Sequence, residues 1–334
     1  MENCILLDAG SGGRASQRLI NQLFLKYFDN EILRQFDDGA VLNSVKGRIV
    51  VSTDSYTVTP LFFKGGSIGK LAICGTVNDI SMMGARPIAL SCSFIIEEGL
   101  SLDILEKIVG DMKKELNKIN ISIVTGDTKV VPKGCADKLF INTTGFGEVY
   151  ANPIPSGHNA SHGDAVIVSG SVGDHGLAIM ASRENLPFLS DVESDSAPLD
   201  RMVEKVISSV GEVKVLRDPT RGGLVTTLNE IAEQSNVEIV IDEKNIPIHE
   251  NVKNGCSFLG LDPLYLANEG KCICIVQEKY SEKVLEVMKS FSEGKEASRI
   301  GTVYSGKSRV VLKTLIGGER ILGMLEGAQL PRIC

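Results

Sequence analysis

Residues 51–87 read VSTDSYTVTPLFFKGGSIGKLAICGTVNDISMMGARP, and this stretch predicts the architecture of the chain. Its first residues continue a run of apolar and β-branched residues from residue 48, which is typical of a buried strand. Residues 68–85 are rich in small and aliphatic residues and reach a glycine near their end, which predicts a helix. Residues 86–98 return to a strand pattern. A strand, a helix and a strand in succession indicate a mixed α/β fold.

The same alternation continues through both halves of the chain. An amphipathic helix is expected over residues 16–28, and a second helix carries the apolar stripe Leu105, Val109, Met112, Leu116 and Ile119. We expect further strands at 121–127, 138–149, 164–170, 271–276 and 308–313, and further helices at 173–182 and 221–235.

Residues 151–164, ANPIPSGHNASHGD, form the clearest boundary because proline, glycine, asparagine and serine cluster there between two periodic regions. We therefore predict two domains, over residues 39–152 and 160–324. A glycine-rich segment with a helix precedes them at 1–38, and a tail without periodicity follows at 325–334.

The composition is that of an ordinary globular protein, with 43% hydrophobic and 23% charged residues. A length of 334 residues leaves room for two domains that each bury a core. The net charge of −7 argues against a general binder of nucleic acids or of anionic membranes.

The eight cysteines include no Cys-x-x-Cys pair, so we interpret the seven internal ones as buried, reduced, structural thiols. The opening MENCILLDAGSGG lacks the basic and apolar regions of a signal peptide, and no run of 18 apolar residues suggests a membrane span. We predict a cytoplasmic protein, in which a thiol stays reduced.

Aspartates at the ends of predicted elements, beside glycine or other small residues, are the first candidates for chemistry. They are Asp38, Asp54, Asp79, Asp127 and Asp218. Hard oxygen ligands of this kind suit Mg²⁺, which takes a few carboxylates and leaves its other positions to water and phosphate. An anionic protein that binds an anionic nucleotide also needs metal ions between the like charges. The alternative for each aspartate alone is a helix cap or a turn.

Two glycine-rich stretches, residues 10–14 and 62–70, could let backbone N–H groups approach a phosphate. Neither fits the P-loop pattern, and a plain loop is the alternative for both.

Lys129 and Glu269 could stabilise a developing negative charge and accept a proton, respectively. Lys129 follows Asp127 closely enough to share its site, and Glu269 lies between a helical stretch and a strand. A surface lysine and a helix-end carboxylate are the alternatives. The four histidines have no ligand spacing around them and predict no site.

The chain ends in LPRIC, with Cys334 as its last residue. Ten extended residues from Leu325 span at most about 33 Å, which is enough to move a thiol between a cleft and a partner's surface. The terminal carboxylate disfavours the thiolate, and Arg332 could offset that effect. The alternative is a frayed end with an incidental cysteine.

Together these motifs closely resemble the HypE family of hydrogenase maturation factors, the carbamoyl dehydratases. The resemblance covers almost the whole chain in order and rests on DDGAVL, residues 51–87, VTGDTKVV, DPTRGGL, ANEGK and the terminal PRIC. NDISMMGA and GDTK also occur in the wider PurM-like superfamily of aminoimidazole ribonucleotide synthetase and selenophosphate synthetase. The terminal PRIC distinguishes the HypE family from those relatives.

The resemblance implies a two-domain PurM-like α/β (α+β) fold with a flexible C-terminal tail. The N-terminal domains, residues 39–152, would pair into a β-barrel across a homodimer, with ATP in the cleft beside it. It also implies a task, which is to prepare the cyanide ligands of the iron in [NiFe]-hydrogenases. The partner HypF carbamoylates the terminal cysteine, the resulting S-carboxamide is dehydrated to a thiocyanate with ATP, and the HypC–HypD complex accepts the cyanide.

Fitted to that chemistry, Cys334 carries the substrate and Lys129 steadies the transferring phosphoryl group. Glu269 is the preferred base, with Asp79 as the competing candidate. The predicted Mg²⁺ ligands are Asp38, Asp79, Asp127 and Asp218, and the predicted nucleotide contacts are Asp38, Asp54, Gly66, Asn78 and Asp127.

Two rival functions remain open at this point. A small-molecule ligase or phosphotransferase of the same superfamily is the nearer one, but Cys4 lacks the glycine-rich arrangement of the reactive cysteine in selenophosphate synthetase. A non-catalytic scaffold in a maturation complex is the second. The acidic set together with Lys129 and Glu269 argues against the scaffold.

Overall fold

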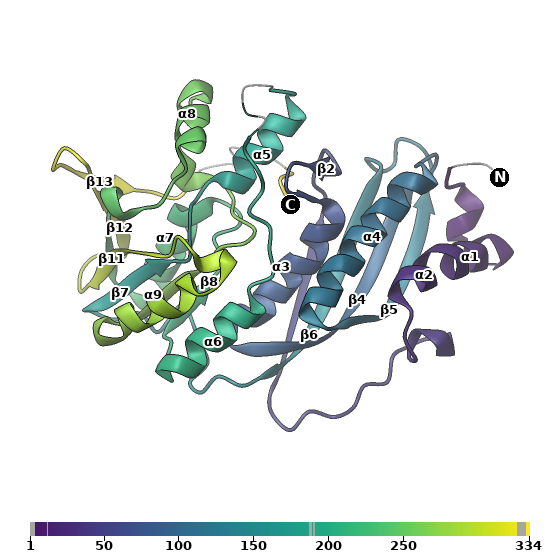
Figure 1. The fold of residues 1–334 in the computed structure, drawn as a ribbon, viewed down its shortest axis with the longest axis horizontal. Helices are drawn as coiled ribbons and strands as arrows, with labels where there is room; N and C mark the ends of the chain where they lie inside the picture. The colour runs from purple at the N-terminus through teal and green to yellow at the C-terminus, as the bar shows by residue number, and fades with distance from the viewer. Residues whose placement is uncertain (1–3, 12, 187–188, 190, 326–331) are drawn as a thin grey trace.

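A central helix, α3 (Ile68–Met82), lies between two mixed α/β units (Figure 1). The computed structural model describes residues 4–11, 13–186, 189, 191–325 and 332–334. Of the 15 residues of α3, 13 are buried, so the helix carries apolar and small residues all round instead of an amphipathic stripe. Ser67 caps its N-terminus, and the Ser67 side chain accepts a hydrogen bond from the backbone N–H of Lys70.

The first unit is a four-stranded sheet with α3 and α4 (Leu102–Ile119) on one face (Figure 1). In sheet order, its strands are β1 (Ile49–Tyr56), β6 (Leu139–Val149), β4 (Ala85–Glu97) and β5 (Ser122–Val131). β1 and β5 are therefore the two edges. A short hairpin, β2 (Phe62–Phe63) and β3 (Gly66–Ser67), leads into α3. The N-terminal segment contains α1 (Gly13–Leu19), a π-helical turn (Ile20–Phe24) and α2 (Leu25–Phe28), of which α2 packs on α4.

The second unit is a seven-stranded sheet. In sheet order, its strands are β13 (Glu319–Leu322), β12 (Arg309–Lys313), β9 (Glu238–Asp242), β11 (Ser298–Tyr304), β7 (Asp164–Val168), β10 (Ile273–Gln277) and β8 (Val215–Arg217). Its helices are α5 (Asp174–Arg183), α6 (Asp200–Val210), α7 (Gly223–Ser235), α8 (Glu250–Leu259) and α9 (Ser281–Lys289). The apolar core of the first unit continues into α5 and takes in Ile333 from the end of the chain.

The face of the first sheet away from α3 and α4 carries exposed apolar side chains. The strand register places Ile49, Val51 and Ile95 on this face, and they are 61%, 58% and 43% exposed. Ile49 and Val51 lie toward one end of this face and Ile95 toward the other, which makes the open face a candidate surface for association.

Each strand and helix named from the sequence is present, with boundaries shifted by a few residues. The predicted helix over 16–28 is interrupted by the π-helical turn, and the predicted stripe from Leu105 to Ile119 is the buried face of α4. Sequence periodicity did not reveal α6, α8, α9 or the strands β8, β9, β11 and β13. Of the predicted tail, residues 326–331 lie outside the described residues.

The prediction that all seven internal cysteines are buried is wrong for two of them. Cys135 is exposed in the turn between β5 and β6, and Cys4 is half-buried; the other five are buried, and all eight are free thiols. Across the described ranges, no helix is long and apolar enough to cross a lipid bilayer.

Candidate active site

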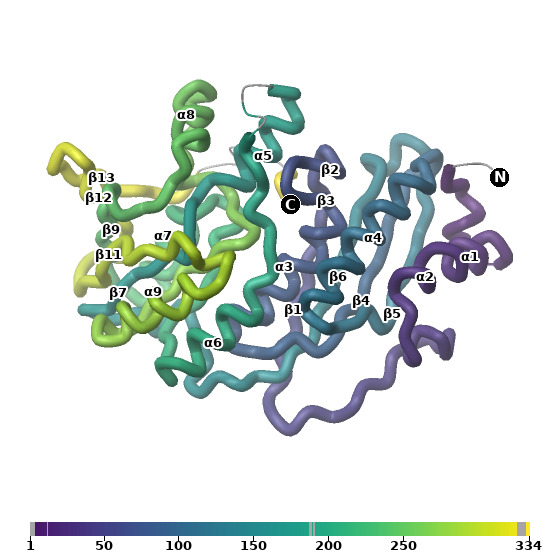
Figure 2. The backbone as a smooth tube through the Cα atoms, viewed as in Figure 1, coloured from purple at the N-terminus to yellow at the C-terminus, as the bar shows by residue number. Residues whose placement is uncertain are grey.

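The last three residues of the chain are packed between the end of β1 and α5. The view in Figure 2 places the C-terminus beside the β2–β3 hairpin and α5. The backbone N–H of Thr57 donates to a main-chain oxygen of Cys334 at 2.9 Å, and His175 Nε2 lies 2.7 Å from the Ile333 oxygen. The Ile333 side chain is buried, so the end of the chain belongs to the core instead of fraying from it.

His175 is the residue at this site that sequence reasoning missed. Its ring is fully buried, with Phe63 edge-on at 5.6 Å and Ser194 Oγ 2.8 Å from Nδ1. Burial lowers the pKa of His175, which keeps the ring neutral near pH 7. Because a carbonyl oxygen can only accept, the neutral ring donates from Nε2 to Ile333 and accepts from Ser194 at Nδ1. An isolated histidine in a helix gives no local pattern that could have predicted this role.

Glu269 is the most strongly perturbed carboxyl group near the tail. Its side chain is 4% exposed, and Oε1 has no hydrogen-bond partner among the described residues. Burial raises its pKa well above the ordinary value, and the negative charges of Asp218 and Asp195 raise it further. A buried carboxyl group without a partner is costly, which points to a functional reason for keeping it.

The loop that holds Glu269 is fixed by its neighbours in sequence. Asn268 accepts a hydrogen bond from the Gly173 N–H and donates to Pro219, which ties this loop to α5 and to the segment that follows β8. At Gly270, a Cβ atom would lie 1.9 Å from the Asp195 carbonyl oxygen. The glycine is therefore required for the close approach of residues 195–197.

Asp54, Asp79 and Asp218 complete a carboxylate cluster with Glu269. Asp79 Oδ2 accepts a hydrogen bond from Ser52 Oγ at 2.6 Å, yet desolvation raises the pKa of Asp79 above its ordinary value. Desolvation and the charge of Asp79 raise the pKa of Asp218 to about 7. The structure thus brings together four predicted site residues, Asp54, Asp79, Asp218 and Glu269, from distant parts of the sequence.

The negative charges of this cluster act on the thiol of Cys334. Burial raises the pKa of its thiol to about 12, with Glu269 and Asp54 adding to the effect and Arg221 opposing it. Arg332 was expected to stabilise the Cys334 thiolate against the terminal carboxylate. Its guanidinium instead donates to Asp137 at 2.8 Å and lies over the Phe140 ring. The docked sulfur is therefore a protonated thiol and not a nucleophilic thiolate.

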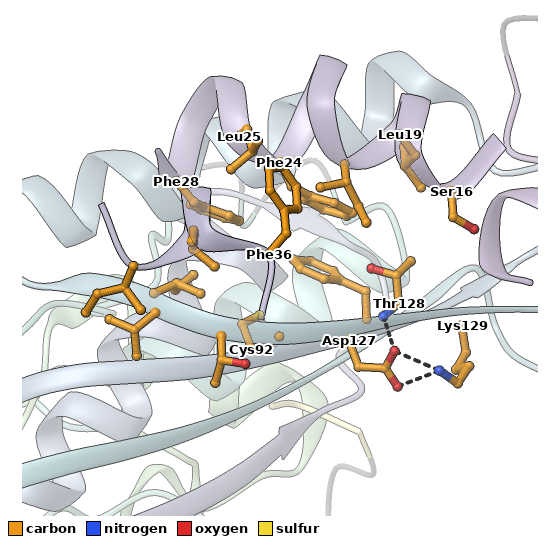
Figure 3. A pocket seen from close by; sticks show the side chains of 18 of the residues that line it. Ser16, Leu19, Phe24, Leu25, Phe28, Phe36, Cys92, Asp127, Thr128 and Lys129 are labelled. Atoms are coloured by element: carbon orange, nitrogen blue, oxygen red, sulfur yellow. Dashed lines mark hydrogen bonds and ion pairs between the residues drawn. The ribbon is translucent and has the colours of Figure 1, made fainter. Parts of the chain in front are cut away.

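Asp127 and Lys129 form a separate group at the other edge of the first sheet. Lys129 Nζ lies 2.7 Å from both carboxylate oxygens of Asp127, and this contact lowers the pKa of Asp127. Both residues line a cavity of about 420 Å³ between the N-terminal helices and β5, where Figure 3 shows the pair at the edge of an apolar wall. Asp37 and Gly39 also line the cavity, whereas Asp38 between them, a predicted Mg²⁺ ligand, does not.

The predicted site residues therefore fall into two groups within one chain. β1 carries Asp54 and β5 carries Asp127, with β6 and β4 between them. Three strand spacings amount to about 14 Å, so the carboxylate cluster and the Asp127–Lys129 pair do not touch.

Asn78 and Gly66 have structural contacts of their own. Asn78 is buried on α3, and its amide donates to the Ala197 and Glu269 carbonyls and accepts from the Leu199 N–H. At Gly66, a Cβ atom would lie 2.6 Å from the Phe63 ring, so the hairpin itself requires glycine there. Their contacts with a nucleotide stay a prediction.

Mg²⁺ fits the chemistry of the carboxylate cluster. Within the described part of the chain, no group of three or more histidine, cysteine, aspartate or glutamate side chains is placed to hold a metal ion. However, Mg²⁺ commonly takes only one or two carboxylates and completes its shell with water and phosphate oxygens. The unpartnered Oε1 of Glu269 and the raised pKa values of Asp79 and Asp218 mark a place where a cation would relieve repulsion.

Comparison with known proteins identifies the family. The model of the AIR synthase related protein N-terminal domain matches residues 36–149, and that of the C-terminal domain matches residues 161–313. The carbamoyl dehydratase HypE of Azotobacter vinelandii is 48% identical over 326 residues, which cover 97% of this chain and 96% of the relative. The HypE of Escherichia coli K12 is 43% identical over 337 residues, which cover 99% of this chain and 100% of the relative. The chain belongs to the HypE family of carbamoyl dehydratases.

Solved structures agree with this assignment. A crystal structure of HypE in complex with ATP superposes with a TM-score of 0.96 at 57% identity, covering 98% of this chain and 99% of that one. HypE from a HypE–HypF complex gives a TM-score of 0.81 at 48% identity, covering 92% and 99%. A thiamine-monophosphate kinase of Stenotrophomonas maltophilia, at 19% identity and a TM-score of 0.69, shares the fold alone. The resemblance to HypE proteins and the mixed two-domain PurM-like fold are thus confirmed, and the chain is a member of a hydrogenase maturation family.

The pKa of Asp218 predicts an unusual effect of an Asp218→Asn substitution on stability. Between the ordinary aspartate pKa of about 4 and the folded value of about 7, the folded protein keeps a proton that the unfolded chain releases. Wild-type stability therefore falls as the pH rises through this window, and an asparagine removes that loss. In Mg²⁺-free buffer at pH 8 we expect Asp218→Asn to be more stable by about 1–3 kcal/mol in urea unfolding, with the gain vanishing near pH 4.

Asp191→Asn is the matched control, because that side chain is exposed. A destabilised Asp218→Asn variant at pH 8, with Asp191→Asn unchanged, would contradict the raised pKa.

Proposed function

We propose that this chain dehydrates an S-carboxamide on its own Cys334 to a thiocyanate at the expense of ATP. The observation that carries the proposal is the terminal cysteine docked beside Glu269, a buried carboxyl group whose Oε1 has no partner among the described residues. The family assignment supports the reaction class, and the ATP complex of a relative 57% identical supports the nucleotide.

The reaction balances as carboxamide plus ATP to thiocyanate, ADP and phosphate. The carboxamide oxygen attacks the γ-phosphorus, which converts a poor leaving group into phosphate when the C–O bond breaks. Both N–H protons leave as the nitrile forms. Most of the work in phosphoryl transfer is positioning and charge neutralisation.

In this proposal Glu269 accepts a proton from the substrate nitrogen, and its raised pKa suits that role. Asp79 remains the competing base. Asp79 and Asp218 would hold Mg²⁺, which supplies positive charge to the phosphates and favours the ionised form of Glu269. The desolvation that makes the Cys334 thiol unreactive also limits the access of water to the modified sulfur.

Partners and location follow from the same chemistry. The solved HypE–HypF complex of a relative supports HypF as the carbamoyltransferase, and HypC–HypD is the proposed acceptor that carries the cyanide to iron. The tail must leave its docked position for both encounters. Free thiols throughout the chain support a reducing compartment such as the cytoplasm.

We propose further that residues 39–152 pair across a homodimer into a closed β-barrel. The exposed aliphatic side chains of Ile49, Val51 and Ile95 on the open sheet face support this pairing. Closing a barrel removes both free edges of each sheet. It therefore brings Asp127 and Lys129, on the edge strand β5, to the line where two subunits meet.

The reaction is tested by weighing the intact protein after incubation with HypF, carbamoyl phosphate and MgATP. We expect a gain of one carbamoyl group and then the loss of one water, both mapping to Cys334. Glu269→Gln should be carbamoylated normally but lose water about 10² to 10⁴ times more slowly, because the base is missing. The exposed Glu250→Gln variant on α8 is the matched control.

An unmodified Cys334 in a protein that still hydrolyses ATP would reject the proposal and favour a small-molecule substrate. Normal dehydration by Glu269→Gln would move the base to Asp79.

The dimer is tested with Val51→Lys, which places a charge on the proposed apolar interface. We expect a dimeric wild type and a folded, monomeric variant in light scattering coupled to gel filtration. Ile316→Lys on the β12–β13 hairpin is the control, because Ile316 is 95% exposed but lies on the other unit. A wild-type monomer, or a dimeric Val51→Lys, would rule out this interface.

A further inference from the structure

The last three residues are held by groups from distant parts of the chain. Arg183 Nη2 donates to the Arg332 oxygen at 2.8 Å, His175 donates to the Ile333 oxygen, and Thr57 donates to the Cys334 oxygen. Three consecutive backbone oxygens are thus each satisfied by a separate donor. Donors arranged in this way bind a peptide backbone in one register only.

The side chains of the tail add sequence preference to this backbone contact. Ile333 is 8% exposed and belongs to the apolar core cluster of the first unit. Arg332 Nε donates to the Thr57 oxygen at 2.9 Å, and its guanidinium pairs with Asp137. An arginine followed by a branched aliphatic residue therefore fits better than other pairs.

The donors are held in place by contacts that do not involve the tail. Ser194 orients His175, and the Ser196 N–H donates in turn to Ser194 Oγ at 3.2 Å. Arg183 Nε donates to the Thr59 oxygen at 3.1 Å, and Thr57 directly follows β1. A site whose donors are fixed beforehand loses little entropy when its ligand binds.

We propose that Thr57, Asp137, His175 and Arg183 form a tail-binding site that accepts a separate peptide ending in Arg-Ile-Cys, including the end of a second copy of this chain. None of the contacts requires a covalent link between the peptide and the rest of the protein. The inference goes beyond the dehydration reaction and does not depend on it, because it concerns binding of the unmodified tail.

The chain's own tail is the main competitor in any test. A tethered ligand has an effective concentration that can reach the millimolar range, so a free peptide binds the wild type poorly. An Ile333→Asp substitution in the full-length chain removes this competitor, since a charged side chain is strongly disfavoured in an apolar core. It changes only the end of the chain and leaves the four site residues intact.

The experiment measures fluorescence anisotropy of a labelled peptide, Leu-Pro-Arg-Ile-Ser, in which serine prevents oxidation. We expect saturable binding to the Ile333→Asp protein, and affinity for the wild type lower by about tenfold or more. A second peptide, Leu-Pro-Arg-Asp-Ser, should bind Ile333→Asp at least about tenfold more weakly, because it lacks the buried isoleucine. Arg183→Ala in the Ile333→Asp background should also weaken binding of the first peptide.

The peptide comparison requires no change to the folded core, so it stays decisive if Arg183→Ala fails to fold. Three results would each overturn the proposal. The two peptides could bind the Ile333→Asp protein equally, the first peptide could bind the wild type as tightly as Ile333→Asp, or it could fail to bind Ile333→Asp. Failure here would leave the dehydration reaction untouched, because the mass measurement on Cys334 tests that reaction separately.

Discussion

The site depends on a single buried amide, Asn78, at the contact between the two units. It donates to two carbonyl oxygens and accepts from one N–H of the second unit while sitting on the central helix of the first. Only a side chain with both donors and an acceptor can satisfy that set, and any buried group left unpaired costs free energy. One of the carbonyls belongs to Glu269, and the next residue on the helix is Asp79. The contact that joins the units therefore also fixes the two candidate bases relative to each other.

Electrostatic strain concentrates where the units meet. Desolvation and like charges raise the pKa values of Glu269, Asp79 and Asp218, while the Asp127–Lys129 pair across the sheet has the opposite, relaxed character. A carboxyl group with a raised pKa is stabilised when it binds a cation or a proton. A carboxylate already paired with a lysine gains less from either. This contrast supports the proposal that proton chemistry occurs at the carboxylate cluster and that Asp127 and Lys129 position the nucleotide.

Local patterns in the sequence predicted the elements well because strands and helices are local in the chain. The buried stripe of α4 and the small-residue helix α3 are examples, and the short amphipathic α9 shows where the pattern was too brief to notice. The site was harder to predict. Asp79, Asp218 and Glu269 were identified through motifs, but their mutual approach is tertiary, and so is the separation of Asp127 from them by the width of the sheet. His175 carries no local signal, since its role exists only once α5 and the end of the chain meet.

The central claim is that Cys334 rests as a docked, half-buried and protonated thiol beside Glu269. The most direct measurement is its alkylation rate by iodoacetamide at pH 8 in the native protein, mapped by mass spectrometry against the exposed Cys135 of the same chain. Because only the thiolate reacts, the account predicts that Cys334 is modified about a hundred times more slowly than Cys135, and that Ile333→Asp removes the difference. Equal rates for the two cysteines in the wild-type protein would contradict the docked tail on which the account rests.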